Sequence, residues 1–261
     1  MSAIDALVGS AAASDLIPSS RSPLERLLHA LNQPLTGLHC SLELALVGQR
    51  TPEQYVDAMR EGLELAGRMS VLVAAIREVV DIKEEPQYPG PESERQQNQA
   101  GGGNSEVIAL DGLLREAVSE LQPVAEAKPG HIFLHCAEPL PVRAACPRLT
   151  SAVFRLLDSA LSLATPGAAL QITACRESRH ACLQVRWEPG TYPPKPADFS
   201  RPELGLLIAE AAWEHLGGNW SRFRSCSGSP EKTGGLETVL ARLPLALTGN
   251  QYPTESLGGS R

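Results

Sequence analysis

The sequence predicts an α+β protein in which an N-terminal helical hairpin is followed by a mixed α/β domain. Three observations predict this fold class. Leucines recur at alternating spacings of four and three between residues 24 and 42, which is typical of one apolar stripe along a helix. Residues 83–105 contain almost no large apolar side chains. From residue 106 onward, strand-like and helical patterns alternate, which favours helices packed on a mixed sheet.

The predicted hairpin spans residues 22–82. Ser22 and Pro23 suit the N-cap and the first position of a helix. The stripe on this first helix consists of Leu24, Leu28, Leu31, Leu35, Leu38 and Leu42. Thr51, Pro52 and Gln54 predict the start of a second helix, which runs to about residue 82. A lone hairpin leaves one apolar face in water, so we expect a homodimer whose two hairpins form a four-helix bundle.

The remaining regions are divided by composition. We expect residues 1–21 and 247–261 to be disordered, and residues 83–105, which are rich in Pro, Gly, Gln and Glu, to form a flexible linker. The second domain then spans residues 106–246. Its strands are predicted at VIAL, HIFLHCA, AALQITACRE, ACLQVRWEP, NWSRFRSCS and GGLETVLARLPL. Its helices are predicted at DGLLREAVSELQPVAEA, PRLTSAVFRLLDSALSLA and PELGLLIAEAAWEHLG.

Composition excludes several functional classes. The chain has 261 residues and a formal net charge of −7, and its Lys and Arg residues are scattered, so we expect no nucleic-acid partner. No apolar run approaches the roughly 20 residues that cross a bilayer, and the first residues lack a basic start. We therefore expect a cytoplasmic protein with no membrane contact. Six cysteines without a CxxC pair predict neither a metal site nor a disulfide framework.

The segment HALNQPL, residues 29–35, indicates a function. It resembles the histidine box of two-component histidine kinases, in which a histidine is followed by an acidic residue, Leu, two variable positions, Pro and Leu. Further along the chain, PRLTSAVFRLLDSALSLAT and LGLLIAEAAWEHLGGNWS are similar in order and spacing to the family's Asn-rich helix and Gly-rich box. The resemblance covers residues 24–245. It implies a dimerisation hairpin followed by a histidine-kinase-type α/β sandwich domain of the ATP-binding type.

The resemblance also implies roles for residues of the box. His29 would be the phosphoacceptor, because an imidazole nitrogen can attack a phosphoryl group and pass it to an aspartate. That aspartate would belong to a response-regulator receiver domain. Asn32 and Gln33 are candidate site residues with His29. In the family, the position of Gln33 often holds a residue that positions water. Pro34 removes a backbone hydrogen bond to Ala30, so we expect the helix to loosen beside His29.

Five residues would contact a nucleotide if ATP binding is retained. Arg155 and Ser159 align with the asparagines that hold phosphate and magnesium in the family, although Arg155 also suits a solvated helix surface. Glu188 and Gly190 are the remnant of the adenine-reading box, and Gly205 is the remnant of the Gly-rich box. ATP and Mg²⁺ are therefore expected cofactors only for an active kinase.

Several departures from the family's pattern disfavour kinase activity. Ala30 stands where the family has an acidic residue that takes the imidazole proton. Ser159 is a poorer magnesium ligand than an amide carbonyl. Ser200 and Glu203 form a capping-box pattern, in which each side chain would bond the other residue's N–H and so occupy a helix N-terminus that would otherwise bind phosphate.

These observations leave three interpretations. The first is a phosphorelay protein that exchanges phosphoryl groups through His29, with a degenerate nucleotide domain and an upstream kinase or sensor as a further partner. The second is an active ATP-dependent histidine kinase. The third is a dimeric adaptor that performs no phosphoryl chemistry.

Overall fold

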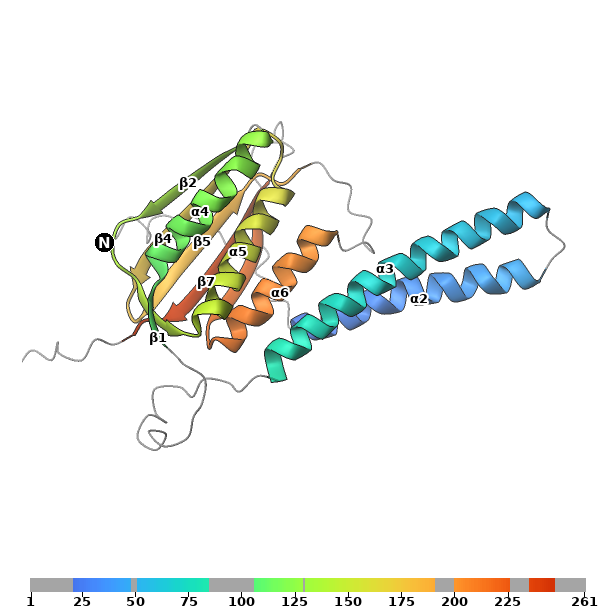
Figure 1. The fold of residues 1–261 in the computed structure, drawn as a ribbon, viewed down its shortest axis with the longest axis horizontal. Helices are drawn as coiled ribbons and strands as arrows, with labels where there is room; N and C mark the ends of the chain where they lie inside the picture. Colours follow the sequence, from blue (N-terminus) through green and yellow to red (C-terminus); the bar gives the residue numbers. More distant parts are fainter. Residues whose placement is uncertain are drawn as a thin grey trace, which may run out of the picture.

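The computed structural model describes residues 21–47, 51–84, 106–128, 130–190, 200–225 and 235–246. Within these residues the chain forms a long helical hairpin and an α/β domain (Figure 1). The α+β fold class is therefore confirmed. The predicted disordered tail, nearly all of the predicted disordered N-terminus and nearly all of the predicted linker lie outside the described residues. None of the helices in the described ranges is long and apolar enough to cross a membrane.

The hairpin consists of α2 (Pro23–Leu46) and α3 (Pro52–Glu84). Ser22 caps α2 with a complete capping box, in which its hydroxyl accepts from the Glu25 N–H and the Glu25 carboxylate accepts from the Ser22 N–H. Thr51 and Gln54 make the same reciprocal bonds at the start of α3. The cap chemistry thus sets both helix starts, and α3 ends two residues beyond the predicted end. Helix α2 continues through Pro34, which is buried.

The domain is built on a mixed five-stranded sheet. Its strand order is β2-β4-β5-β7-β6, with β2 parallel to β4 and all other neighbours antiparallel. The strands are β2 (His131–Cys136), β4 (Ala169–Glu177), β5 (His180–Trp187), β6 (Asn219–Ser225) and β7 (Leu236–Pro244). A separate two-stranded sheet pairs β1 (Glu106–Ala109) with β3 (Pro141–Ala144). Strand β3 has no counterpart among the predicted elements, because four residues that begin with proline carry too little alternation to identify a strand.

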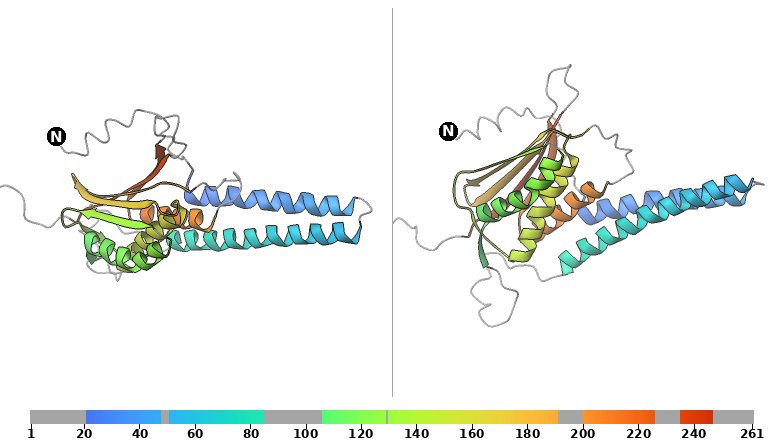
Figure 2. Two further views of the ribbon diagram at one scale, coloured as in Figure 1. Left: turned by 90° about the horizontal axis from the view of Figure 1, so that it is seen from above. Right: turned by 45° about the horizontal axis from the view of Figure 1, so that its top comes forward.

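Three helices cover one face of the sheet (Figure 2). They are α4 (Leu110–Ala127), α5 (Cys146–Leu163) and α6 (Arg201–His215). The core between the two layers contains Trp187 and Trp213, both fully buried, together with the inward-facing aliphatic residues of the strands. Because α6 also contacts the hairpin, it lies between α5 and α3 in Figure 1.

A second apolar cluster joins the hairpin to the domain. We call it the junction cluster. Its buried members come from α2, α3 and α6, and they are Leu27, Ala30, Leu72, Ala75, Val79, Leu204, Leu207, Ile208 and Ala211. Leu24 and Leu31 of the leucine stripe are partly buried against this cluster, so the base of the hairpin covers part of the stripe.

Three of the six leucines in the stripe remain exposed within a single chain. Leu28 is 46% exposed, and Leu35 and Leu42 are each 52% exposed. On α3, Val56, Met59 and Leu63 are also more than half exposed. Both hairpin helices thus present large apolar side chains that no other described part of the same chain covers.

Candidate functional site

His29 lies on an exposed side of α2, one residue after Leu28 of the stripe. Asn32 and Gln33 are exposed as well. They follow His29 by three and four residues, so the three side chains occupy neighbouring positions on the helix surface. The structure therefore brings the three candidate box residues together at a site that a partner protein can reach.

Ala30 has the opposite environment. It is 2% exposed and belongs to the junction cluster, where residues of α6 surround the base of the hairpin. An ionised carboxylate at this position would lose hydration inside an apolar cluster, which is costly. The absence of an acidic residue beside His29 therefore has a structural reason, because this side of α2 is buried in an apolar contact.

Ser159 and Gly205 meet directly where α5 and α6 pack together. Ser159 is 3% exposed. A Cβ atom added to Gly205 would lie 2.2 Å from the Ser159 hydroxyl oxygen and 3.5 Å from the Ser159 Cβ. A contact this close leaves no space for a phosphate group between the two residues.

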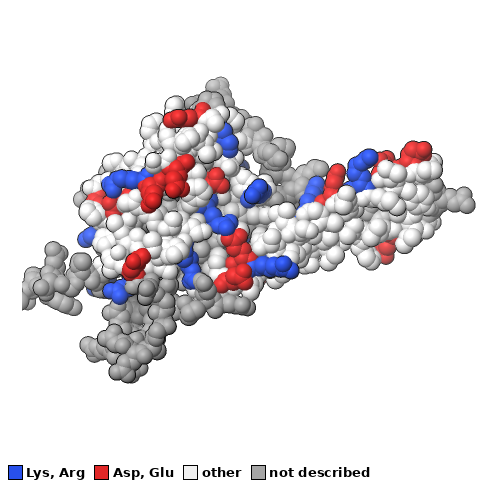
Figure 3. Space-filling view, in the orientation of Figure 1, with Lys and Arg blue, Asp and Glu red and all other residues white. Residues whose placement is uncertain are grey.

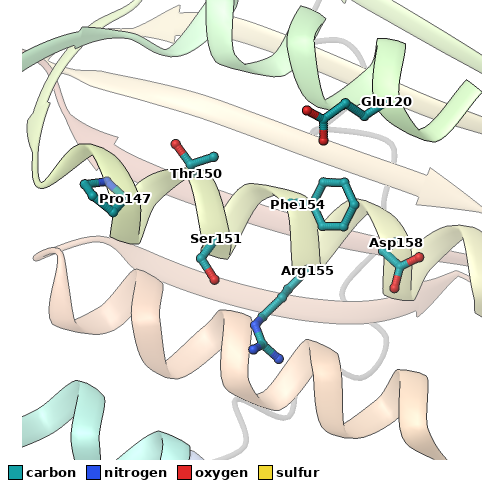
Figure 4. A pocket seen from close by; sticks show the side chains of 7 residues that line it. All are labelled: Glu120, Pro147, Thr150, Ser151, Phe154, Arg155 and Asp158. Atoms are coloured by element: carbon teal, nitrogen blue, oxygen red, sulfur yellow. The ribbon is translucent and has the colours of Figure 1, made fainter.

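Arg155 is directed toward another part of the molecule. Its guanidinium forms an ion pair with the Glu78 carboxylate of α3, and in Figure 4 its side chain points toward α6. Arg155 also borders an open depression of about 530 Å³ between α4 and α5. The remaining residues that line it are Glu120, Pro147, Thr150, Ser151, Phe154 and Asp158. Of the five candidate nucleotide residues, only Arg155 lines this depression.

Glu188 and Gly190 are held against the end of α5 by backbone hydrogen bonds. The Thr165 N–H donates to the Glu188 carbonyl at 2.8 Å, and the Gly190 N–H donates to the Leu163 carbonyl at 3.0 Å. The Glu188 side chain is exposed. These bonds use the backbone of the remnant box to connect α5 with the chain that follows β5.

The start of α6 differs in part from the predicted capping box. The Ser200 hydroxyl accepts from the Glu203 N–H at 3.4 Å, as expected. The Glu203 carboxylate, however, does not bond back to Ser200. It accepts two hydrogen bonds from Arg222 of β6, at 2.7 and 3.1 Å, and Arg222 also donates to Glu237 of β7 at 2.6 Å. The prediction that Glu203 bonds back to the Ser200 N–H was therefore wrong, because the Arg222 guanidinium on β6 binds the Glu203 carboxylate with two hydrogen bonds.

The pKa of Arg222 depends on burial and on the two carboxylates that it binds. Burial by itself would lower the pKa of Arg222, but the Glu203 and Glu237 carboxylates raise it above its ordinary value. Arg222 therefore stays charged and holds Glu203 in place. A carboxylate fixed in the first turn of α6 disfavours a phosphate at the same helix end.

We expect Gly205→Ala to lower the free energy of unfolding by about 1–3 kcal/mol, the usual cost of overpacking a filled interior. The new methyl group would clash with the Ser159 hydroxyl. Urea denaturation of the purified protein measures the change. In Gly205→Ala combined with Ser159→Ala, the nearest of these atoms lies at an ordinary 3.5 Å, so most of the loss should be recovered. Equal losses in the single and double variants would contradict the direct contact.

Two ion pairs between the hairpin and the domain could not be recognised in the sequence. Arg26 of α2 pairs with Glu210 of α6, and Glu78 of α3 pairs with Arg155 of α5. No local pattern joins residues so far apart along the chain. On the face shown in Figure 3, acidic and basic side chains lie next to each other where the domain meets the hairpin.

Among solved structures, the fold is similar to several histidine kinases. The histidine kinase AdeS of Acinetobacter baumannii is 17% identical, with 83% of this chain and 98% of that chain covered and a TM-score of 0.45. Full-length ShkA in complex with AMPPNP is 17% identical, with 87% and 46% covered and a TM-score of 0.48. The cytoplasmic segment of histidine kinase QseC is 17% identical, with 67% and 95% covered and a TM-score of 0.44. No protein-family model and no curated protein matches the sequence.

Proposed function

We propose that this chain is a two-component phosphorelay protein of the histidine kinase family. His29 accepts a phosphoryl group from a receiver domain or an upstream kinase and exchanges it with the aspartate of a response-regulator receiver. The observation that carries this proposal is the contrast within one helical turn. His29, Asn32 and Gln33 are exposed, while Ala30, which stands where a kinase has its acidic residue, is buried in the junction cluster.

The proposed chemistry is a direct exchange between two protein side chains. The unprotonated nitrogen of the His29 imidazole attacks the phosphorus of an aspartyl phosphate. A phosphorus–nitrogen bond forms, the phosphorus–oxygen bond to the aspartate breaks, and the carboxylate leaves with the bonding electrons. The imidazole ring then releases its N–H proton to water. The reverse sequence passes the group to the next receiver.

The α/β domain serves as a docking scaffold and does not bind a nucleotide in this proposal. Three of the five candidate residues support this view. Ser159 and Gly205 fill the space between α5 and α6, and Arg155 is paired with Glu78. A magnesium nucleotide does not fit these residues as they are arranged, so no step of the reaction is assigned to it.

The protein acts as a homodimer in this proposal. Leu28, Leu35 and Leu42 are spaced by seven residues and are half exposed, which is the spacing by which paired helices bury one face. A second copy offers the same stripe. The pairing of two hairpins would place His29 beside the covered face, where a receiver domain can still approach it.

The experiment that tests the proposal compares two phosphoryl donors. We expect the purified protein to gain no acid-labile label from γ-labelled ATP with Mg²⁺. The same protein should gain label on His29 from a labelled phosphorylated receiver and lose it to an unlabelled one. Peptide mapping identifies the labelled residue.

The two alternative functions predict different results in this experiment. Clear labelling of His29 by ATP would identify an active kinase. No labelling from either donor, across a panel of receivers, would support the dimeric adaptor. Either result would overturn the phosphorelay proposal.

A further inference from the structure

Helix α6 is buried on two sides by two different sets of residues. Leu206, Ala209 and Trp213 belong to the core between the helices and the sheet. On the other side, the residues of α6 that pack against the hairpin are Leu204, Leu207, Ile208 and Ala211. A helix that is apolar around its circumference is stable only when both sides are covered. If the hairpin left α6, four buried apolar side chains would enter water.

Charged pairs surround this apolar contact. Arg26 pairs with Glu210 on one side, and Glu78 pairs with Arg155 on the other. Burial raises the pKa of Glu210 above its ordinary value even though Arg26 opposes the shift. The guanidinium therefore does not fully offset the cost of burying this carboxylate, whereas the apolar side chains of the cluster gain free energy from their burial.

Ala30 is the position at which α2 needs a small residue. It is 2% exposed, it lies between Leu27 and Leu31 along the chain, and its side chain packs in the same cluster as the α6 residues. A larger or charged side chain would disrupt the packing of this cluster, in which α2, α3 and α6 meet, since protein interiors contain few voids that could accept added atoms.

We infer that Ala30 and the hairpin-facing side of α6 hold the hairpin and the α/β domain together as one body, so that the domain is a fixed part of the surface around His29. The inference deepens the proposed function and rests on it for the role of His29. In the proposed exchange between two protein side chains, no step requires the domain to move.

The test measures whether the hairpin-facing side of α6 is accessible to solvent in the full-length dimer. Leu207 is 4% exposed, so the thiol that Leu207→Cys introduces should react with a maleimide at least about 100-fold more slowly than an exposed thiol, because only a local opening exposes it. We call it the α6 thiol. Cys40 of α2 is exposed and serves as the fast reference in the same chain. Peptide mass spectrometry resolves the two sites.

Ala30→Glu in the same background should release α6. We expect the α6 thiol to react within about tenfold of Cys40, because a larger, charged side chain inside the apolar cluster disfavours the docked state. Thr36→Glu is the matched control, since Thr36 is exposed on the same helix, and it should leave the α6 thiol protected.

Cys182 reports whether the domain stays folded. It is buried in the sheet, where burial raises its pKa to about 11. Its continued protection shows that the domain is still folded.

Two outcomes would overturn the inference directly, and a third would leave the decision to a milder substitution. Rapid labelling of the α6 thiol without the Ala30 change would mean that the domain leaves the hairpin freely. Slow labelling of this thiol in Ala30→Glu would mean that Ala30 does not hold the contact. Labelling of both Cys182 and the α6 thiol in Ala30→Glu would mean that this substitution unfolds the domain. The milder Ala30→Leu would then decide: it must expose the α6 thiol while Cys182 stays protected, and the inference is wrong if it does not. Transfer from a labelled receiver to His29, measured on the same samples, reports separately on the proposed function.

Discussion

Replacing His29 with alanine is expected to reduce phosphoryl exchange with a receiver domain to background. The substitution removes the only atom that forms the phosphorus–nitrogen bond in the proposed reaction, and removing a covalent nucleophile typically costs several orders of magnitude in rate. The measurement follows radiolabel on the protein after mixing with a phosphorylated receiver. Because His29 is exposed, the substitution should leave the thermal stability nearly unchanged.

His39→Ala is the matched control for this experiment. His39 lies on the same helix, is exposed, and makes only a 3.6 Å contact with the Glu43 carboxylate. We expect it to keep normal exchange. If His29→Ala kept full exchange, or if both variants lost it equally, the phosphoacceptor would have to be placed elsewhere. Intact signalling by His29→Ala in cells would favour the adaptor.

Leu35→Glu is expected to dissociate the dimer. Leu35 is 52% exposed at the middle of the stripe. Because Leu35 is already about half buried within one chain, pairing can bury only about half of the roughly 1.5–3 kcal/mol available from a fully exposed leucine. Its loss from two copies would weaken the dimer by roughly one to two powers of ten in Kd. Two carboxylates facing each other across the interface would add repulsion. Sedimentation equilibrium over a range of concentrations measures the change.

Leu44→Glu provides the control for the dimer experiment. It makes the same chemical change on the same helix, and Leu44 is 62% exposed. Nine residues separate it from Leu35, which places it about 180° around the helix. We expect Leu44→Glu to remain dimeric. A protein that sediments as a monomer before any substitution, or a Leu35→Glu dimer as stable as the unaltered one, would rule out the four-helix arrangement.

Local chemistry explains which parts of the fold could be predicted. The helix starts at Ser22 and Thr51 depend on residues within one turn of the cap, so they can be recognised in any sequence window. Strands β4 and β5 alternate apolar and polar residues over their length, and their inward side chains are buried. Strands β6 and β7 were also predicted, and they pair with each other in antiparallel orientation.

Features that depend on distant residues could not be predicted in the same way. Glu203 has an obvious partner in Ser200, but β6 presents Arg222 to it from 19 positions away. The burial of Ala30 depends on α6, which begins 171 residues later along the chain. One local signal was available, because LGLLIAEAAW in α6 contains a single polar residue, Glu210, and a helix that is apolar on most of its surface is covered on more than one side.

The double coverage of α6 has a consequence for how the molecule loses its structure. Two modules that share no core would melt in separate steps, the weaker one first. Here a single helix contributes side chains to both cores, so disorder in either one removes packing from the other. A destabilising change in either part is therefore expected to lower the stability of the other as well.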